Sequence, residues 1–137
     1  MIVWVSIQTF EEAKLLYTIR TVTLKNGSFT KEVPVIEFKD SEQAILAEFL
    51  MSDSALLVDE IHEAVKEINQ GKEGNAKWFG NRCSVYIEGS TALIQDQLED
   101  MGINIATYPS YEIDVTELQQ LMNMWLDVKD RYENNRS

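Results

Sequence analysis

The sequence has few residues that cross-link a chain, take part in catalysis or restrict the backbone: one cysteine, one histidine and two prolines in 137 residues. Because Cys83 is the sole cysteine, no intrachain disulfide can form. One cysteine and one histidine are also too few ligands for a typical zinc site. No stretch approaches the ~18 to 20 apolar residues of a membrane-spanning helix. The apolar run Met1–Ile7 lacks a basic flank and leads directly into Glu11 and Glu12. We therefore expect no secretion signal and a cytoplasmic location.

Positive charge is also scarce. The chain holds 12 Lys+Arg against 23 Asp+Glu, a net charge of −11, while 45% of its residues are apolar. This composition predicts a folded domain with an acidic surface. Such a surface repels phosphate backbones and anionic membranes, so we expect no nucleic-acid and no membrane partner. A basic protein is the expected partner.

The order of strand and helix signals predicts a single α+β domain over residues 1–137. We expect an antiparallel sheet built from two hairpins, with helices packed on one face. Ahead of the first hairpin, β-branched residues predict a strand over 2–7, and the segment from Thr9 predicts a helical turn before a strand over 17–24.

The first hairpin is predicted at Asn26-Gly27, a pair that readily takes the positive φ angles of a two-residue turn. This turn sets Leu24 opposite Phe29. The return strand contains Pro34, which cannot donate a hydrogen bond to a neighbouring strand. We therefore expect the return strand at a sheet edge.

The second hairpin is predicted around Gly89-Ser90, between strands over 83–88 and 91–98. Pairing Glu88 with Thr91 places the apolar residues of both strands on common faces, which supports this register. A further strand is expected in one of two places, Ile103–Tyr108 or Tyr111–Ile113.

One helix is predicted over 41–51, a second from Asp53 or Ser54 to Gln70, ended by Gly71, and a loop over 72–82. A last helix is predicted from Asp114, which begins a capping-box-like sequence. Its apolar stripe consists of Leu118, Leu121, Met122, Trp125, Val128 and Tyr132.

Acidic residues are concentrated in two blocks: residues 37–70 hold nine against two basic residues, and residues 83–117 hold seven against none. If these blocks share one side of the domain, they form a docking face for a basic protein. The alternative is that they serve solubility alone. Trp78 and Phe79, in the loop predicted between the two blocks, are aromatic residues that could anchor a partner. The candidate partner-binding residues are Asp59, Glu60, Glu63, Glu67, Trp78, Phe79, Asp96, Glu99 and Asp100.

Catalytic and metal-binding patterns are weak. Asp59 and His62 have the i, i+3 spacing of a carboxylate–histidine metal motif, but no second histidine completes it. Cys83 as a nucleophile would need His62 as its base. We therefore expect no metal, no cofactor and no enzymatic activity, with an enzyme using these two residues as the competing hypothesis.

The chain resembles the small acidic immunity proteins of bacterial toxin systems, including contact-dependent inhibition. The resemblance rests on size and acidity, the hairpin Cys83–Thr91, the acidic segment Asp96–Asp100 and the closing helix from Asp114 to Trp125. It implies a cytosolic protein that binds and neutralises a toxin domain, usually a nuclease. The alternative function is a housekeeping or regulatory interaction subunit without catalytic activity, including a homodimer built on a sheet edge or on Trp78-Phe79.

Overall fold

The computed structural model describes residues 5–10, 15–72, 74–98 and 107–134, with the backbone alone for 5–10 and 134. It confirms the α+β class. The first antiparallel sheet has the order β1 (Val5–Phe10), β2 (Leu15–Asn26), β3 (Phe29–Phe38). The second has the order β4 (Asn75–Phe79), β5 (Cys83–Glu88), β6 (Thr91–Asp96), β7 (Tyr111–Asp114). The helices are η1 (Ser41–Gln43), α1 (Ala44–Asn69) and α2 (Val115–Asn134).

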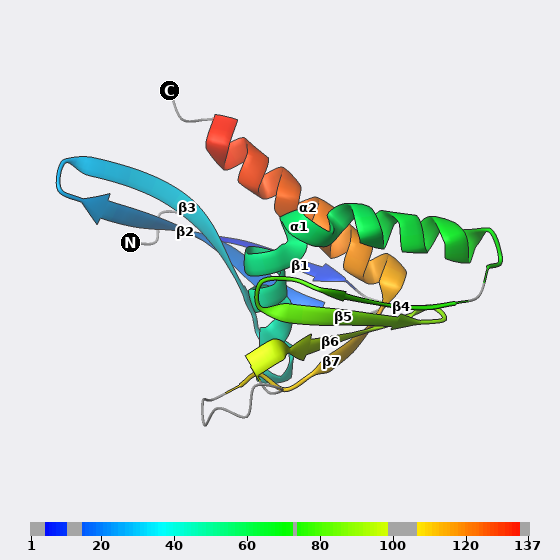
Figure 1. Cartoon of the computed structure of the whole chain (residues 1–137). Helices are drawn as coiled ribbons and strands as arrows, with labels where there is room; N and C mark the ends of the chain where they lie inside the picture. The colour runs from blue at the N-terminus through cyan, green and yellow to red at the C-terminus, as the bar shows by residue number, and fades with distance from the viewer. Residues whose placement is uncertain (1–4, 11–14, 73, 99–106, 135–137) are drawn as a thin grey trace.

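The two predicted hairpins belong to two separate sheets and not to one. The whole of α1 separates β3 from β4 along the chain, so each hairpin completes a sheet of its own. Both long helices contact both sheets, and the buried side chains of all these elements form one apolar cluster. In Figure 1 the β2–β3 hairpin extends outward at the left, away from the second sheet. The helix pair therefore connects the two sheets.

The register of the first hairpin differs from the prediction. Asn26 pairs with Phe29 and Leu24 with Lys31, so the turn residues are Gly27 and Ser28. Gly27 has a φ of 62°, a conformation that glycine adopts without steric cost. The turn is centred on this glycine, and Asn26 stays in the strand.

The other predictions for the first sheet have mixed outcomes. The edge position of β3, which contains Pro34, is confirmed. The helical turn expected from Thr9 is wrong for Thr9 and Phe10, which belong to β1 and pair with Leu16 and Leu15. Residues 11–14 and the predicted strand residues 2–4 lie outside the described part of the chain.

Helix α1 is continuous where two helices were predicted. The Ser52 hydroxyl donates to Glu48 Oε1 at 3.1 Å, and the Ser54 hydroxyl donates to the Leu50 carbonyl. These polar side chains are therefore satisfied inside the helix and do not end it. A hydrogen bond from a serine hydroxyl to the backbone carbonyl four residues earlier often bends a helix. In Figure 1 the teal and green halves of α1 run in different directions.

The second sheet confirms one prediction and corrects another. Glu88 pairs with Thr91 and Val85 with Ile94, as predicted for the second hairpin. The segment 72–82 is not only a loop, because it contains β4, in which Trp78 pairs with Val85. Ala76 and Trp78 are half-buried while Lys77 and Phe79 are exposed, the alternation of a strand with one covered face. Of the two places proposed for a further strand, the second is confirmed as β7.

Helix α2 begins and packs as predicted. The Asp114 carboxylate accepts the backbone N–H of Thr116 at 2.8 Å and of Glu117 at 3.3 Å, which caps the first turn. Trp125 is buried on the predicted stripe. The stripe residues Leu118, Leu121 and Met122 are also buried, and Val128 and Tyr132 are half-buried.

Candidate functional site

A groove of about 290 Å³ lies between the C-terminal half of α1 and the strands β4 and β5. Glu60, Glu63 and Glu67 line it from α1, where their spacing of three and four residues places them on one helix face. Trp78 lines it from β4. We call this site, defined by these four residues, the acidic groove. The structure thus brings together four of the predicted partner-binding residues.

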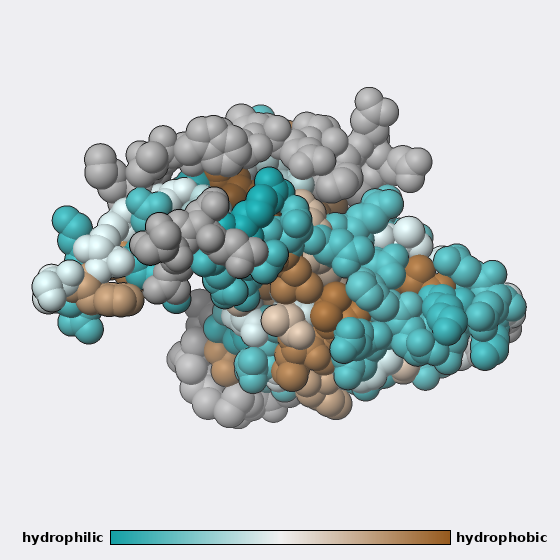
Figure 2. Space-filling view, turned by 90° about the horizontal axis from the view of Figure 1, so that it is seen from above, coloured by the Kyte–Doolittle hydropathy of each residue, from teal (hydrophilic) through white to brown (hydrophobic). Residues whose placement is uncertain are grey.

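The glutamates of the acidic groove have no ionic partners in the part of the chain that the structure describes. None of the three forms an ion pair or hydrogen bond with the described residues. The Oε2 atom of half-buried Glu60 is buried without a hydrogen-bond partner in this part of the chain. Lys72 is the basic residue among the groove's described lining residues. Figure 2 shows the end of the molecule that carries this half of α1, at the right, covered by hydrophilic residues.

The floor of the acidic groove is apolar. Ala64 and Ile68 contribute from α1, and Ile87 from β5. An apolar floor, a carboxylate wall and an indole ring suit the side chain of a lysine or arginine. Its alkyl stem packs on apolar surface, while its charged head meets carboxylates and the face of an aromatic ring.

Asp59 and Phe79 lie outside the acidic groove. Asp59 is exposed on α1 and does not line it. Phe79 is 60% exposed and faces away from Trp78, because successive residues of a strand alternate sides. The Lys77 Nζ lies 5.3 Å from the centre of the Phe79 ring. The two aromatic residues therefore do not form one anchor.

Asp96 is not a surface residue, which corrects its predicted role. Its carboxylate accepts two hydrogen bonds from the Arg82 guanidinium, both at 2.9 Å. It also accepts the backbone N–H of Leu98 at 3.0 Å and of Tyr108 at 3.1 Å. These bonds, led by the one from Arg82, lower the pKa of Asp96 to about 2 although its burial opposes the shift. Glu99 and Asp100 lie outside the described residues.

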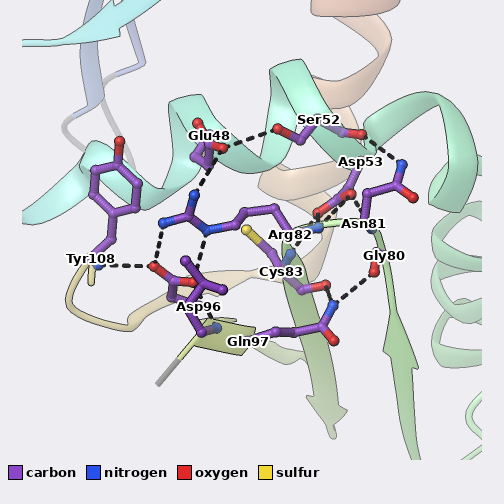
Figure 3. Close-up of polar contacts among 11 residues, drawn as sticks. Glu48, Ser52, Asp53, Gly80, Asn81, Arg82, Cys83, Asp96, Gln97 and Tyr108 are labelled. Carbon is purple, nitrogen blue, oxygen red and sulfur yellow. Dashed lines mark hydrogen bonds and ion pairs between the residues drawn. The ribbon is translucent and has the colours of Figure 1, made fainter. Parts of the chain in front are cut away.

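Asp96 belongs to a polar cluster that ties the β4–β5 loop to α1 (Figure 3). Buried Asp53, on α1, accepts the backbone N–H groups of Asn81, Arg82 and Cys83, the last at 2.7 Å. Arg82 also lies 3.7 Å from the Glu48 carboxylate. On the other side of the loop, Gln97 donates to the carbonyls of Gly80 and Cys83 at 2.8 and 2.9 Å.

The polar cluster was missed in the sequence, where Asp53 was interpreted only as a helix start. A carboxylate in the middle of an otherwise apolar helix face is the signal that could have found it. With its polar atoms engaged by the protein itself, the cluster positions the β4–β5 loop. It thereby fixes β4, and with it Trp78, against α1.

His62 and Cys83 do not form a catalytic pair. His62 Nε2 lies 2.8 Å from Asn123 Oδ1 on the exposed side of the α1–α2 contact. Cys83 is buried, and burial, followed by the negative charges of Asp53 and Asp96, raises the pKa of its thiol. Among the described residues, no group of three or more His, Cys, Asp or Glu side chains could hold a metal ion. Nor is any helix in this part of the chain long and apolar enough to span a membrane.

Comparison of the chain with protein-family models, curated proteins and solved structures gives no match. The chemistry of the acidic groove is therefore the basis for assigning a function.

Proposed function

We propose that this protein is a cytoplasmic immunity protein that binds and neutralises a cognate toxin domain, a basic nuclease, through the acidic groove. The observation that carries the proposal is the set of three glutamates beside Trp78 that form no ion pair with the described residues. The net charge of −11 supports it, because a field of one sign speeds encounter with a partner of the other sign.

The proposed mechanism is electrostatic occlusion. A nuclease holds its substrate's phosphates with lysine and arginine side chains. The carboxylates of Glu60, Glu63 and Glu67 offer negative charge in place of those phosphates, and Trp78 offers an aromatic face to a cation. A toxin whose basic cleft is filled in this way cannot bind nucleic acid.

The test compares the wild-type chain with two triple variants. One carries Glu60→Gln, Glu63→Gln and Glu67→Gln in the acidic groove. The control carries Glu32→Gln, Glu42→Gln and Glu112→Gln, three exposed glutamates elsewhere that form no ion pair with the described residues. Both variants change the net charge by the same amount, so only the position of the charge differs.

Each protein is immobilised and exposed to a lysate of the organism that encodes it, and captured proteins are identified by mass spectrometry. We expect one basic protein that arrests growth when produced alone and is harmless beside the wild-type chain. The acidic-groove variant should bind it about tenfold more slowly at low salt, and the control at the wild-type rate. Equal association rates for both variants, or a captured protein without toxicity, would refute the proposal.

A further inference from the structure

Strand β4 lies at an edge of the second sheet, and among the described strands it pairs with β5 alone. At the end of this pairing the Gly80 N–H donates to the Cys83 carbonyl at 2.8 Å. Alternate residues of an antiparallel strand point their backbone groups towards the same neighbour, so those of Trp78 also face β5. The backbone N–H and carbonyl groups of Lys77 and Phe79 therefore point to the open edge.

This open edge is available for pairing. On that side the backbone groups of Lys77 and Phe79 form no hydrogen bond with the described residues, and both residues are exposed. Strand β4 contains no proline, whereas the edge strand β3 contains Pro34. An exposed edge without proline is a template on which an extended chain can add as a further strand.

The glutamates of the acidic groove lie on the side of α1 nearest this edge. The opposite side of α1 carries His62, whose ring contacts Asn123 of α2. At 3.6 residues per turn, Glu60 and Glu67 lie across the helix from His62. Helix α2 contacts β6 and β7, so the side of α1 that faces away from it is the side of β4. In Figure 1 the C-terminal half of α1 runs alongside β4, and residues of both line the acidic groove.

A second copy of this chain does not fit the open edge. Two β4 strands paired with each other would bring two acidic grooves together, and their like charges would repel. A strand with lysine or arginine side chains on the α1 face would instead meet carboxylates of opposite charge.

We infer that an extended basic segment of the partner adds to the second sheet as a fifth strand, antiparallel to β4. The inference rests on the proposed function and specifies how the partner docks. Segment residues opposite Lys77 and Phe79 exchange backbone hydrogen bonds with them, and their side chains lie beside the exposed Phe79 ring. The residues between them direct basic side chains towards Trp78 and the glutamates of the acidic groove.

The probe is the end-blocked peptide Thr-Arg-Val-Arg-Val-Arg-Thr, added to the whole ¹⁵N-labelled chain. Two derivatives of equal charge carry the same number of N-methyl groups. One is methylated on both valines, whose N–H groups face β4 in the inferred complex, and the other on two arginines, whose N–H groups face away. Binding and amide hydrogen exchange are followed by two-dimensional ¹H–¹⁵N NMR.

We expect the unmodified peptide to slow hydrogen exchange of the Lys77 and Phe79 amides at least about tenfold, and that of the Trp78 amide, which already faces β5, less than about twofold. Methylation of the valines should weaken binding at least about tenfold and methylation of the arginines less than about twofold. Lys77→Pro removes one donor from the open edge and should weaken binding about fivefold. Lys77→Thr removes the same positive charge but keeps the donor, so it should bind at least as tightly as wild type.

Unchanged exchange of the Lys77 and Phe79 amides at about 1 mM peptide, or equal affinities of the two methylated peptides, overturns the inference. Peptide binding that is weakened in the acidic-groove variant but is indifferent to the methylation pattern refutes strand addition and leaves the proposed function standing. A captured partner without toxicity refutes the proposed function, while the exchange and methylation results still decide whether the edge of β4 accepts a strand.

Discussion

Substitution of Asp96 by asparagine tests the internal ion pair that holds the β4–β5 loop. The Asp96 side chain is fully buried and accepts four hydrogen bonds, two of them from Arg82. Asparagine keeps the shape of the side chain and removes its charge. The Arg82 guanidinium then loses its closest anionic partner.

The expected magnitude comes from the pKa. A fall in the pKa of Asp96 from 3.8 to about 2 corresponds to about 2 kcal/mol of stability, at about 1.4 kcal/mol per tenfold change in an equilibrium constant. Because the folded-state pKa is the lower one, this contribution is complete above about pH 4 and is lost as the pH falls towards 2. The Arg82 side chain is 27% exposed, so water compensates part of the charge left behind. We therefore expect the cost of Asp96→Asn to stay near 2 kcal/mol and below that of breaking a fully buried pair.

The assay is urea unfolding followed by circular dichroism between pH 7 and pH 2.5. Wild type and Asp96→Asn should differ by about 2 kcal/mol in unfolding free energy at pH 7, and this difference should fall by about half between pH 4 and pH 2.5. Asp127→Asn is the control, because Asp127 pairs with Arg131 on the exposed surface. This substitution should lower the unfolding free energy by less than about 0.5 kcal/mol. A difference below about 1 kcal/mol at pH 7, or one that does not change with pH, refutes the reasoning.

Three further predictions concern the same region. Gly80→Ala should cost about 2 kcal/mol in thermal unfolding, because a Cβ there would lie 2.6 Å from Asp53 Oδ1; an unchanged midpoint contradicts the packing described. Cys83 should react with a thiol reagent at pH 8 only after unfolding, since burial raises its pKa, and rapid reaction of the folded protein would disprove this. Trp78→Ser should cost about 2 kcal/mol and Phe79→Ser less than about 0.5 kcal/mol in urea unfolding, because Phe79 is 60% exposed; equal costs would contradict the assigned faces of β4.

Elements with strong local signals were predictable from the sequence. The second hairpin has a turn at Gly89-Ser90 and matching apolar residues on both strands, and its register is as predicted. Helix α2 has a capping residue, Asp114, and an unbroken apolar stripe. The edge position of β3 follows from Pro34, whose missing N–H is a property of the residue itself.

Features that depend on distant partners were not predictable. Asp53 looked like a helix start because the N–H groups that satisfy it lie 28 to 30 residues further along the chain. Asp96 looked like a surface charge because its burial depends on Arg82 and on the backbone of Tyr108. Glu60, Glu63 and Glu67 were predicted together as part of an acidic docking face, but the acidic groove exists only because β4 pairs with β5 and faces them.

The arrangement of the first sheet has a consequence for the order in which the protein is made. The side chains of Thr21, on β2, and Tyr132, on α2, form a hydrogen bond between residues 111 positions apart. A ribosome builds the chain from its N-terminus, so the β2–β3 hairpin exists well before the helix that completes its packing. Until α2 has been synthesised, the apolar side chains that it later covers remain open to chaperones and to other nascent chains. The hairpin is among the first parts of the fold to be synthesised and one of the last to be protected.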